Sequence, residues 1–424
     1  MKILRDSPPV LNAIQEMPEM NIEPSGYIGK TPVYLVEGGT QDIVKIDVVF
    51  PAGTRFEKKG MEATSVVNML KEGTENYSSD EISEKLDFLG AHVGSDITKD
   101  RSEVSLVTLN KHLSNTLDIF TDILTCPIFP ERELGIYKRR AKSALNINLE
   151  KVQFMCRLQF AELMFPHSPY RDKMHPSLYE EITPEVLSNF FQRHYSLDGA
   201  YIVVSGKNTR QAAKDLEKEL MPKMRDLIAP RSSLDSWSFE KAEKRTEREG
   251  AVQSAIRMGA PGMHRSNPEF PKFYFANMAL GGYFGSRLMQ NIREDKGYTY
   301  GIGSAINLLE GAAYIHIATE VGAEVTDATI DEIKFELNRI GTEEMAADEL
   351  ELVKQYITGN LLHSFDGPFA TSNRLKVLIN SGLSNQYFSE FSKNINAISS
   401  GEVLEISREW LSPKNFTLSV VGKW

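Results

Sequence analysis

The residues of this chain that are best suited to chemistry lie in its second half, after a glycine-rich loop. The loop spans residues 281–285, and it is followed by Arg293 and, seven residues later, by Tyr300. Phosphate-binding loops have the spacing G-x-G-x-x-G, or they end in lysine followed by serine or threonine, and this loop has neither pattern. The loop is therefore not predicted to hold a phosphate.

Arg293 and Tyr300 also have ordinary structural explanations. Arg293 can be a surface helix residue that pairs with Glu294 or Asp295, an interaction of small energetic value. Tyr300 alternates with Tyr298 and with residues further along as one face of a strand, which would place it in the core. The residue types alone favour these explanations.

Histidine and cysteine form no metal-binding pattern. Of the eight histidines, His167 and His175 are nearest in sequence, and they flank a proline-containing loop with no acid at ligand spacing. The two cysteines, Cys126 and Cys156, make no CxxC pair and are too few for a disulfide framework. No metal site is predicted in this chain, and a reducing compartment fits the cysteine content.

Composition narrows the classes of function. The chain has 424 residues, of which 41% are hydrophobic, and a formal net charge of -10. This acidic balance argues against a nucleic-acid partner, which needs a clustered basic surface. No run of about 18 apolar residues occurs, so no membrane span is predicted. Residues 1–9 lack the apolar segment of a signal peptide; we expect a cytoplasmic protein, or a periplasmic one if a signal peptide has been removed.

Around the candidate residues the sequence predicts alternating strands and helices. Strands at 32–37 and 42–50 are predicted to form a hairpin through the Gly38-Gly39 turn. Ser78 and Glu81 form a capping box that opens a helix running to residue 90, and Thr183 caps another helix. The other predicted elements are strands 91–97, 103–109 and 200–205, and helices 111–124, 131–165 and 209–221.

The second half of the chain repeats the order of the first. Residues 182–206 and 398–422 both run from a helix through a short polar break to an apolar strand that ends in glycine. Residues 94–97 and 303–306 form a second echo at nearly the same offset, close to half of the chain. Any two helix–strand endings can look alike, but two echoes at one offset favour an internal duplication of one α/β unit.

We therefore predict an α+β protein of two homologous α/β domains, each with a largely antiparallel sheet and helices packed on one face, facing each other across a cleft. The predicted parts are an N-terminal arm (1–30), a first domain (31–228), a linker (229–248) and a second domain (249–424). The linker is assigned from its proline, its serines and its dense mixed charge.

The block 281–300 resembles the C-terminal-domain motif of the insulinase/pitrilysin zinc peptidases, which include the mitochondrial processing peptidases and their bacterial relatives. In that family a glycine loop leads into a helix with an arginine, and a tyrosine follows on a strand; the matching residues here are Arg293 and Tyr300. The resemblance covers nearly the whole chain, with further matching segments in family order at 52–57, 71–74, 167–170 and 201–206.

The resemblance implies a zinc site in the first domain, and this sequence lacks it. The family carries H-x-x-E-H on a helix, where two histidines bind the metal and the glutamate acts as general base. The histidine positions are Thr64 and Asn68 here, and the glutamate position is Val67. A hydroxyl, an amide and an isopropyl group cannot replace these ligands and this base.

The rest of the expected zinc site is missing too. The third ligand of the family is a glutamate near residues 141–146, and that segment contains no acid. On the earlier helix the apolar residues instead recur at helical spacing, which predicts a helix kept for the core. They are Ala63, Val66, Val67 and Leu70.

The resemblance implies that Arg293 and Tyr300 bind the peptide backbone across the cleft and hold the scissile carbonyl as it becomes an oxyanion. Some bacterial members divide the work between a chain with zinc and a chain that keeps only the arginine and tyrosine. The leading hypothesis is therefore a chain that is inactive alone and has no cofactor of its own. It would form a heterodimeric metalloendopeptidase with a homologous zinc-bearing partner and bind a peptide substrate.

Two other hypotheses remain open at this point. One is a non-enzymatic structural or binding subunit, like the family's core proteins in respiratory complexes. The other is a homodimeric enzyme with different chemistry, for which no second constellation of residues is present. The retained Arg293 and Tyr300 disfavour a pure scaffold.

Overall fold

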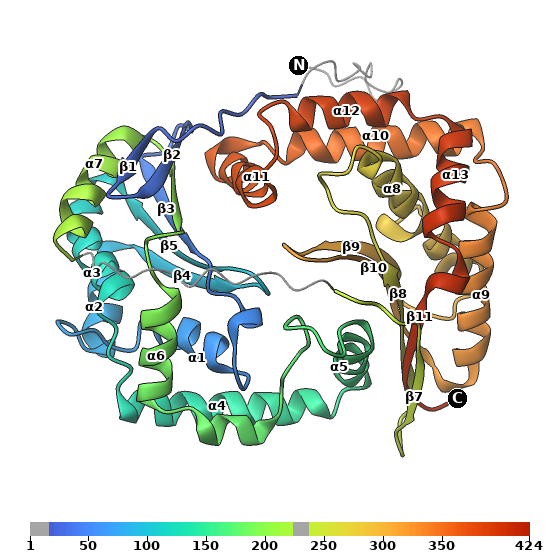
Figure 1. The fold of residues 1–424 in the computed structure, drawn as a ribbon, viewed down its shortest axis with the longest axis horizontal. Helices are drawn as coiled ribbons and strands as arrows, with labels where there is room; N and C mark the ends of the chain where they lie inside the picture. Colours follow the sequence, from blue (N-terminus) through green and yellow to red (C-terminus); the bar gives the residue numbers. More distant parts are fainter. Residues whose placement is uncertain (1–16, 224–236) are drawn as a thin grey trace, which may run out of the picture.

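The computed structural model describes residues 17–223 and 237–424, which build two β-sheets and the helices around them (Figure 1). The sheets lie in opposite halves of the molecule, and most helices follow its outer edge. The predicted fold class, α+β with two α/β units, is confirmed.

The N-terminal sheet has the strand order β1-β2-β6-β3-β5-β4. Its strand β6 (Tyr201–Gly206) is buried along its whole length, because it lies between β2, which runs parallel to it, and β3, which runs antiparallel. The other strands are β1 (Gly26–Ile28), β2 (Thr31–Glu37), β3 (Ile43–Phe50), β4 (His92–Ile97) and β5 (Ser102–Leu109).

The C-terminal sheet has the order β7-β11-β8-β10-β9, which is the order of the first sheet without β1. Here β11 is the buried strand, parallel to β7 and antiparallel to β8. The strands are β7 (Glu243–Glu247), β8 (Gln253–Pro261), β9 (Ile302–Leu308), β10 (Ala313–Gly322) and β11 (Thr417–Gly422). The two sequence echoes fall on equivalent strands, β6 with β11 and β4 with β9, so the repeat in the sequence corresponds to a repeat in topology.

Thirteen α-helices lie in the described part of the chain. Capping predicted from the sequence is found in two of them: Ser78 and Glu81 form the capping box of α2, and Thr183 accepts the Val186 N–H at the start of α6. The helices are α1 (Glu62–Met69), α2 (Ser79–Leu89), α3 (Leu113–Thr125), α4 (Glu131–Leu149), α5 (Val152–Met164), α6 (Pro184–His194), α7 (Thr209–Leu220), α8 (Phe270–Asn277), α9 (Thr326–Ile340), α10 (Ala347–His363), α11 (Gly367–Ser381), α12 (Tyr387–Ala397) and α13 (Ser400–Trp410).

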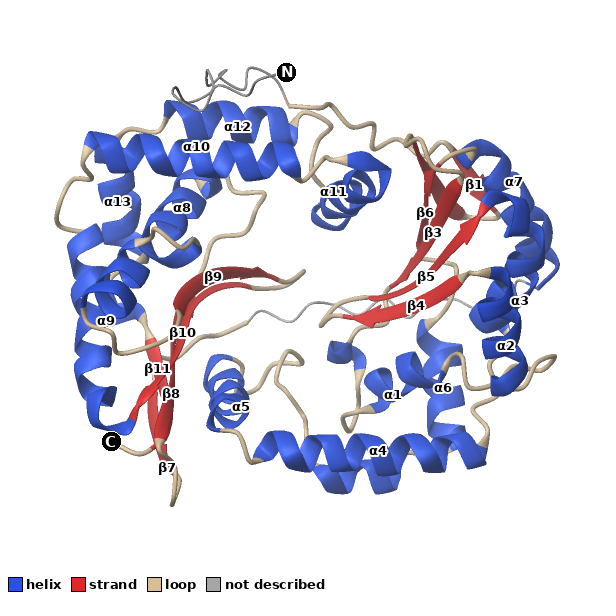
Figure 2. Cartoon of the chain, turned by 180° about the vertical axis from the view of Figure 1, so that it is seen from behind, coloured by secondary structure: helices blue, strands red, loops and turns tan. Residues whose placement is uncertain are grey.

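Each half sends one helix to the sheet of the other half (Figure 2). Helix α5 packs on β8 and β11, where Gln159 Nε2 donates to Ser419 Oγ at 3.0 Å. Helix α11 packs on β2 and β6, where the Tyr201 hydroxyl donates to Asn380 Oδ1 at 2.8 Å. The two halves are therefore interlocked rather than simply adjacent.

The N-terminal segment also crosses between the halves. Met17 and Met20 are buried in the hydrophobic core of the C-terminal half, and the Ile22 N–H donates to Asn385 Oδ1 at 3.2 Å. Residues 26–28 then form β1 at the edge of the N-terminal sheet. The predicted arm thus contains one short strand, which its proline content did not indicate; residues 1–16 lie outside the described part.

Two predictions are wrong: the pairing of the first two predicted strands and the length of the helix predicted at 131–165. Strands β2 and β3 do not form a hairpin, because β6 lies between them, and the Gly38 N–H donates to the Gly206 carbonyl oxygen at 2.8 Å. The predicted helix 131–165 is two helices, since Lys151 takes an extended conformation and redirects the chain so that α5 reaches the C-terminal sheet.

The predicted linker falls partly outside the described part, which omits residues 224–236. Within its remainder, residues 243–247 form β7 and pair with β11. The domain boundaries proposed from the sequence stay a prediction.

Candidate functional site

The glycine loop of the C-terminal half begins in one π-helical segment, η5 (Met278–Gly282), and ends shortly before another, η6 (Met289–Asp295). Such segments are rare and are frequent at functional sites. The loop is packed closely on β9, since a Cβ atom at Gly281 would lie 2.8 Å from the backbone nitrogen of Ser304. Glycine is thus required for the loop to sit where it does.

Arg293 and Tyr300, the two candidate site residues, lie together. The Arg293 guanidinium carbon is 5.3 Å from the ring centre of Tyr300 and 4.6 Å from that of Phe284. Tyr300 is 92% exposed and Phe284 is 63% exposed. A cation between two aromatic faces is held in place by the ring quadrupoles, and here both rings stand at the surface.

This geometry decides between the explanations of Tyr300. Tyr300 is not a core residue, because it precedes β9 and is exposed. The neighbouring Thr299, which also precedes β9, donates its hydroxyl to the Glu320 carbonyl oxygen at 2.7 Å. Arg293 does contact Glu294, with 3.5 Å between Nε and Oε1. This is the ion pair that the ordinary structural explanation of Arg293 predicts. Phe284 was missed by the sequence reasoning, although an aromatic residue inside a glycine loop is a usable signal.

The three positions of the absent zinc motif lie on α1. Val67 is buried, Thr64 is half-buried and Asn68 is exposed. Asn68 Nδ2 donates to the Thr64 carbonyl oxygen at 2.7 Å, which is a contact within the helix itself. Val67 belongs to the hydrophobic core of the N-terminal half, as the apolar spacing of the helix predicted.

A cavity of about 670 Å³ adjoins these positions, and its lining does not fit zinc. Thr64 and Asn68 face Ala141 and Ala144 of α4, the segment where the third ligand was expected. Glu72 and Glu133 also line the cavity, but Glu72 accepts a hydrogen bond from Ser79 Oγ at 2.8 Å and Glu133 pairs with Arg132 at 3.0 Å. Among residues 17–223 and 237–424, no three side chains of His, Cys, Asp or Glu gather as a metal site.

A half-buried carboxylate that sequence reasoning missed lies just before α1. Glu57 Oε1 accepts the backbone N–H of Ala63 at 3.0 Å and that of Thr64 at 3.4 Å. Burial raises the pKa of Glu57 from 4.5 to about 7, and these hydrogen bonds only partly oppose that effect. Nothing local in the sequence indicates that this glutamate is buried.

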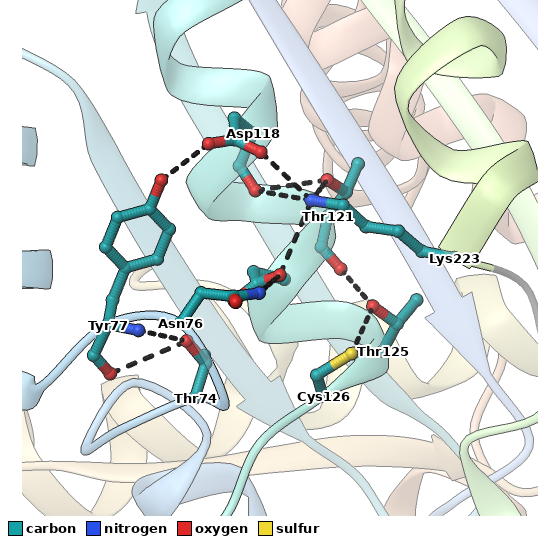
Figure 3. A network of polar contacts seen from close by, with 9 residues as sticks. Thr74, Asn76, Tyr77, Asp118, Thr121, Thr125, Cys126 and Lys223 are labelled. Atoms are coloured by element: carbon teal, nitrogen blue, oxygen red, sulfur yellow. Dashed lines mark hydrogen bonds and ion pairs between the residues drawn. The ribbon is translucent and has the colours of Figure 1, made fainter.

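The chain that follows α1 is held by a polar network around α3 (Figure 3). The Tyr77 hydroxyl donates to Asp118 Oδ2 at 2.5 Å, and Lys223 Nζ donates to Asp118 Oδ1 at 3.1 Å. Asn76 Nδ2 donates to Asp122 Oδ1 at 2.9 Å. The network ties the residues that follow α7 and the segment after α1 to one helix.

A charged seam joins the two halves near the turns β4–β5 and β9–β10. Arg55 lies 2.8 Å from Asp100 Oδ1 and 2.7 Å from Glu310 Oε2, and Arg101 lies 2.7 Å from Glu310 Oε1. The seam borders a cavity of about 240 Å³ between the halves.

Across the described residues, no hydrogen bond, ion pair or ring contact joins Arg293 or Tyr300 to α1.

Of the helices in the described part, none is both long and apolar enough to cross a bilayer.

Known families match both halves of the chain. A family model described as insulinase (peptidase family M16) matches residues 33–159, and one described as peptidase M16 inactive domain matches residues 181–357. An "uncharacterized zinc protease YmxG" of Bacillus subtilis is 23% identical over 415 residues, which is 92% of this chain and 95% of the relative. A "non-peptidase homolog YmxG" of Helicobacter pylori is 20% identical and covers 78% of this chain and 78% of the relative.

Solved structures share the fold over nearly the whole chain. A peptidase M16 inactive domain from Pseudomonas fluorescens has a TM-score of 0.86 at 20% identity and covers 93% of this chain and 96% of that one. A protease from Helicobacter pylori has a TM-score of 0.84 at 12% identity and covers 96% of this chain and 100% of that one.

Proposed function

Because the chain belongs to the insulinase family of peptidases, peptidase M16, we propose that it is the non-catalytic subunit of a heterodimeric zinc metalloendopeptidase. One observation carries this proposal. Arg293 is half-buried and lies against the exposed Tyr300 ring, whereas Thr64, Val67 and Asn68 stand where the family has its ligands and base.

The chemistry that this chain would supply is binding and charge stabilisation. The Arg293 guanidinium and the Tyr300 hydroxyl are donors that suit a peptide carbonyl as it gains negative charge. Such donors act most strongly when they are already held in place, and the Phe284 ring contributes to holding the guanidinium. The metal and the attacking water would come from a homologous partner chain.

A second candidate is a non-enzymatic binding subunit. The Helicobacter pylori relative described as a non-peptidase homolog favours it, as does a helix α1 without metal ligands. The exposed cluster of Phe284, Arg293 and Tyr300 disfavours it, because a scaffold gains nothing from three such groups at a π-helical loop.

The deciding experiment is reconstitution. The purified chain is mixed with an M16 homologue from the same organism that carries H-x-x-E-H. Complex formation is then followed by size-exclusion chromatography, and cleavage of a peptide library is followed by mass spectrometry with and without a chelator. We expect a 1:1 complex that cleaves in a chelator-sensitive way, with no cleavage by this chain alone. A complex that forms but is no more active than the zinc-bearing chain alone would support the binding subunit instead.

A further inference from the structure

Two arginines of the C-terminal half have no acidic partner among the described residues. Arg265 lies in the turn between β8 and α8, and Arg374 lies on α11. Neither makes an ion pair or a hydrogen bond with any of the described residues, and the Nε atom of each is buried without a partner. In a chain of net charge -10, two half-buried cations without a carboxylate are unexpected.

Aromatic side chains form a wall beside Arg265. Arg265 lies 5.9 Å from the ring centre of Phe270, and the rings of Phe270 and Tyr274 are 6.0 Å apart. Phe391 joins the wall, with its ring 5.4 Å from Tyr274 and 5.9 Å from Tyr387. The hydroxyl groups of Tyr274 and Tyr387 make no hydrogen bond within the described part of the chain, so two neutral donors accompany the two cations.

Charge effects on the pKa values link Arg374 with Arg265 and Tyr274. Burial, and then the nearby charge of Arg265, lower the pKa of the Arg374 guanidinium. Burial raises the pKa of Tyr274, while the charges of Arg265 and Arg374 oppose that rise. Both arginines stay protonated, because a guanidinium is not deprotonated in proteins. Two like charges that are partly removed from water repel each other and lack a neutralising anion. The site is therefore less stable without a bound anion than with one.

The two chain segments that carry the arginines also contribute residues to the cavity between the halves. His264 is next to Arg265, and Asn380 is on the same helix as Arg374; both line the cavity of about 240 Å³.

We propose that Arg265, Arg374, Tyr274 and Tyr387 form a binding site for a peptide carboxylate. Guanidinium groups match the planar carboxylate by paired hydrogen bonds, and the phenols can donate to its remaining lone pairs. The aromatic wall would contact the apolar part of the residue that bears the carboxylate, which an inorganic anion lacks. The choice of a peptide rests on the proposed function, whereas the choice of an anion rests on the arginines alone.

The test measures binding to the full chain without any partner, so it does not depend on reconstituted peptidase activity. Three fluorescent peptides share one apolar sequence: one with a free C-terminal carboxylate, one with a C-terminal amide, and one amide with an internal glutamate. Fluorescence anisotropy is measured with the wild-type chain, with Arg265→Met and Arg374→Met, and with Arg132→Met as a control. Arg132 is a matched control because its side chain is 80% exposed on α4.

We expect at least one carboxylate peptide to bind about tenfold or more tightly than the amide without carboxylate, and each site variant to lose this advantage. The two carboxylate peptides show whether the terminus or a side chain is the source. Arg374→Met should leave the melting temperature of the ligand-free chain unchanged or higher, since it removes a repulsion. Equal binding of all three peptides, no binding of any peptide, full binding by the variants, or a lowered melting temperature would overturn the proposal.

Discussion

Lys376 of α11 forms an ion pair with the fully buried Asp47 at the centre of the other half's sheet, with 3.1 Å between Nζ and Oδ2. The same ammonium group lies 2.8 Å from Glu103 Oε1, and Lys45 lies 2.8 Å from Asp47 Oδ1. Two carboxylates and two lysines thus join α11 to strands β3 and β5. Burial, and then the charge of Asp47, raise the pKa of Glu103.

Lys376→Met should destabilise the chain by about 3 kcal/mol, because it leaves a buried carboxylate short of one cation. The free energy of unfolding is measured by urea denaturation at neutral pH. Lys393→Met, at an exposed position of α12, serves as the control and should change little. A variant as stable as the control would mean that Lys45 alone compensates Asp47.

Arg293→Ala and Tyr300→Phe should each lower kcat of the reconstituted complex, on the order of 10²-fold, with assembly unchanged. Assembly should persist because neither side chain fills a core: Tyr300 is 92% exposed. Initial rates and size-exclusion profiles are measured together, with Arg339→Ala and Tyr356→Phe from the same half as controls. If both site variants keep full activity in an intact complex, the assigned role is wrong.

Glu57→Gln should change how stability depends on pH. Because the folded pKa of Glu57 is raised to about 7 from 4.5, its contribution is complete below pH 4.5 and is lost as pH rises through about 7. Glutamine keeps the acceptor oxygen for Ala63 and Thr64 but does not titrate. Relative to wild type, the variant should therefore gain on the order of 2 kcal/mol between pH 5 and pH 8. Denaturation curves at both pH values test this.

The exposed Glu84 on α2 supplies the control for that experiment. Glu84→Gln should show the wild-type pH dependence. His194 and His316, whose pKa values burial lowers to about 4, add an opposite slope below pH 6.5 in all three proteins, so it cancels in the comparison. A Glu57→Gln curve parallel to that of wild type would show that Glu57 is ionised throughout.

Gly259→Ala should weaken the contact of α5 with the C-terminal sheet. A Cβ at Gly259 would lie 2.8 Å from the Ile315 carbonyl oxygen and closer still to the Phe160 ring of α5. Overpacking of this kind costs about 1–3 kcal/mol, measured by urea denaturation. The matched control is Gly401→Ala, where a Cβ meets nothing within 4 Å. Adding Phe160→Leu should recover part of the loss, and an additive double variant would contradict the contact.

Local features of the structure could be predicted and non-local ones could not. The capping box of Ser78 and Glu81 is a local pattern that spans four residues, so the start of α2 was predicted correctly. The Gly38-Gly39 turn is equally local, but the partner of β2 is β6, far along the chain, and no turn residue specifies that. The break at Lys151 has no glycine or proline, because the packing of α5 on the other half determines it.

The candidate site divides in the same way. Arg293 and Tyr300 could be found because a motif of fixed spacing carries them, and the structure adds that Phe284 completes their cluster. Glu57 and the pair of Arg265 and Arg374 could not be found, since their properties come from burial and from missing partners. From sequence alone, a charged residue is expected to be exposed and to pair with an opposite charge. Glu57, Arg265 and Arg374 do not fit that expectation.

The crossing of α5 and α11 bears on how such a chain could have arisen. A single half-length ancestor would have carried one such helix and one sheet face that needs a helix to cover it. It could bury both only by packing its helix on the sheet of a second copy and receiving that copy's helix in return. Two copies related by a two-fold axis would each lend a helix to the other, which is the arrangement that one chain now holds. Gene fusion would then have freed the copies to diverge, so that one half could lose its metal ligands while the other kept Arg293 and Tyr300. Either half expressed alone should consequently associate with itself rather than remain a monomer.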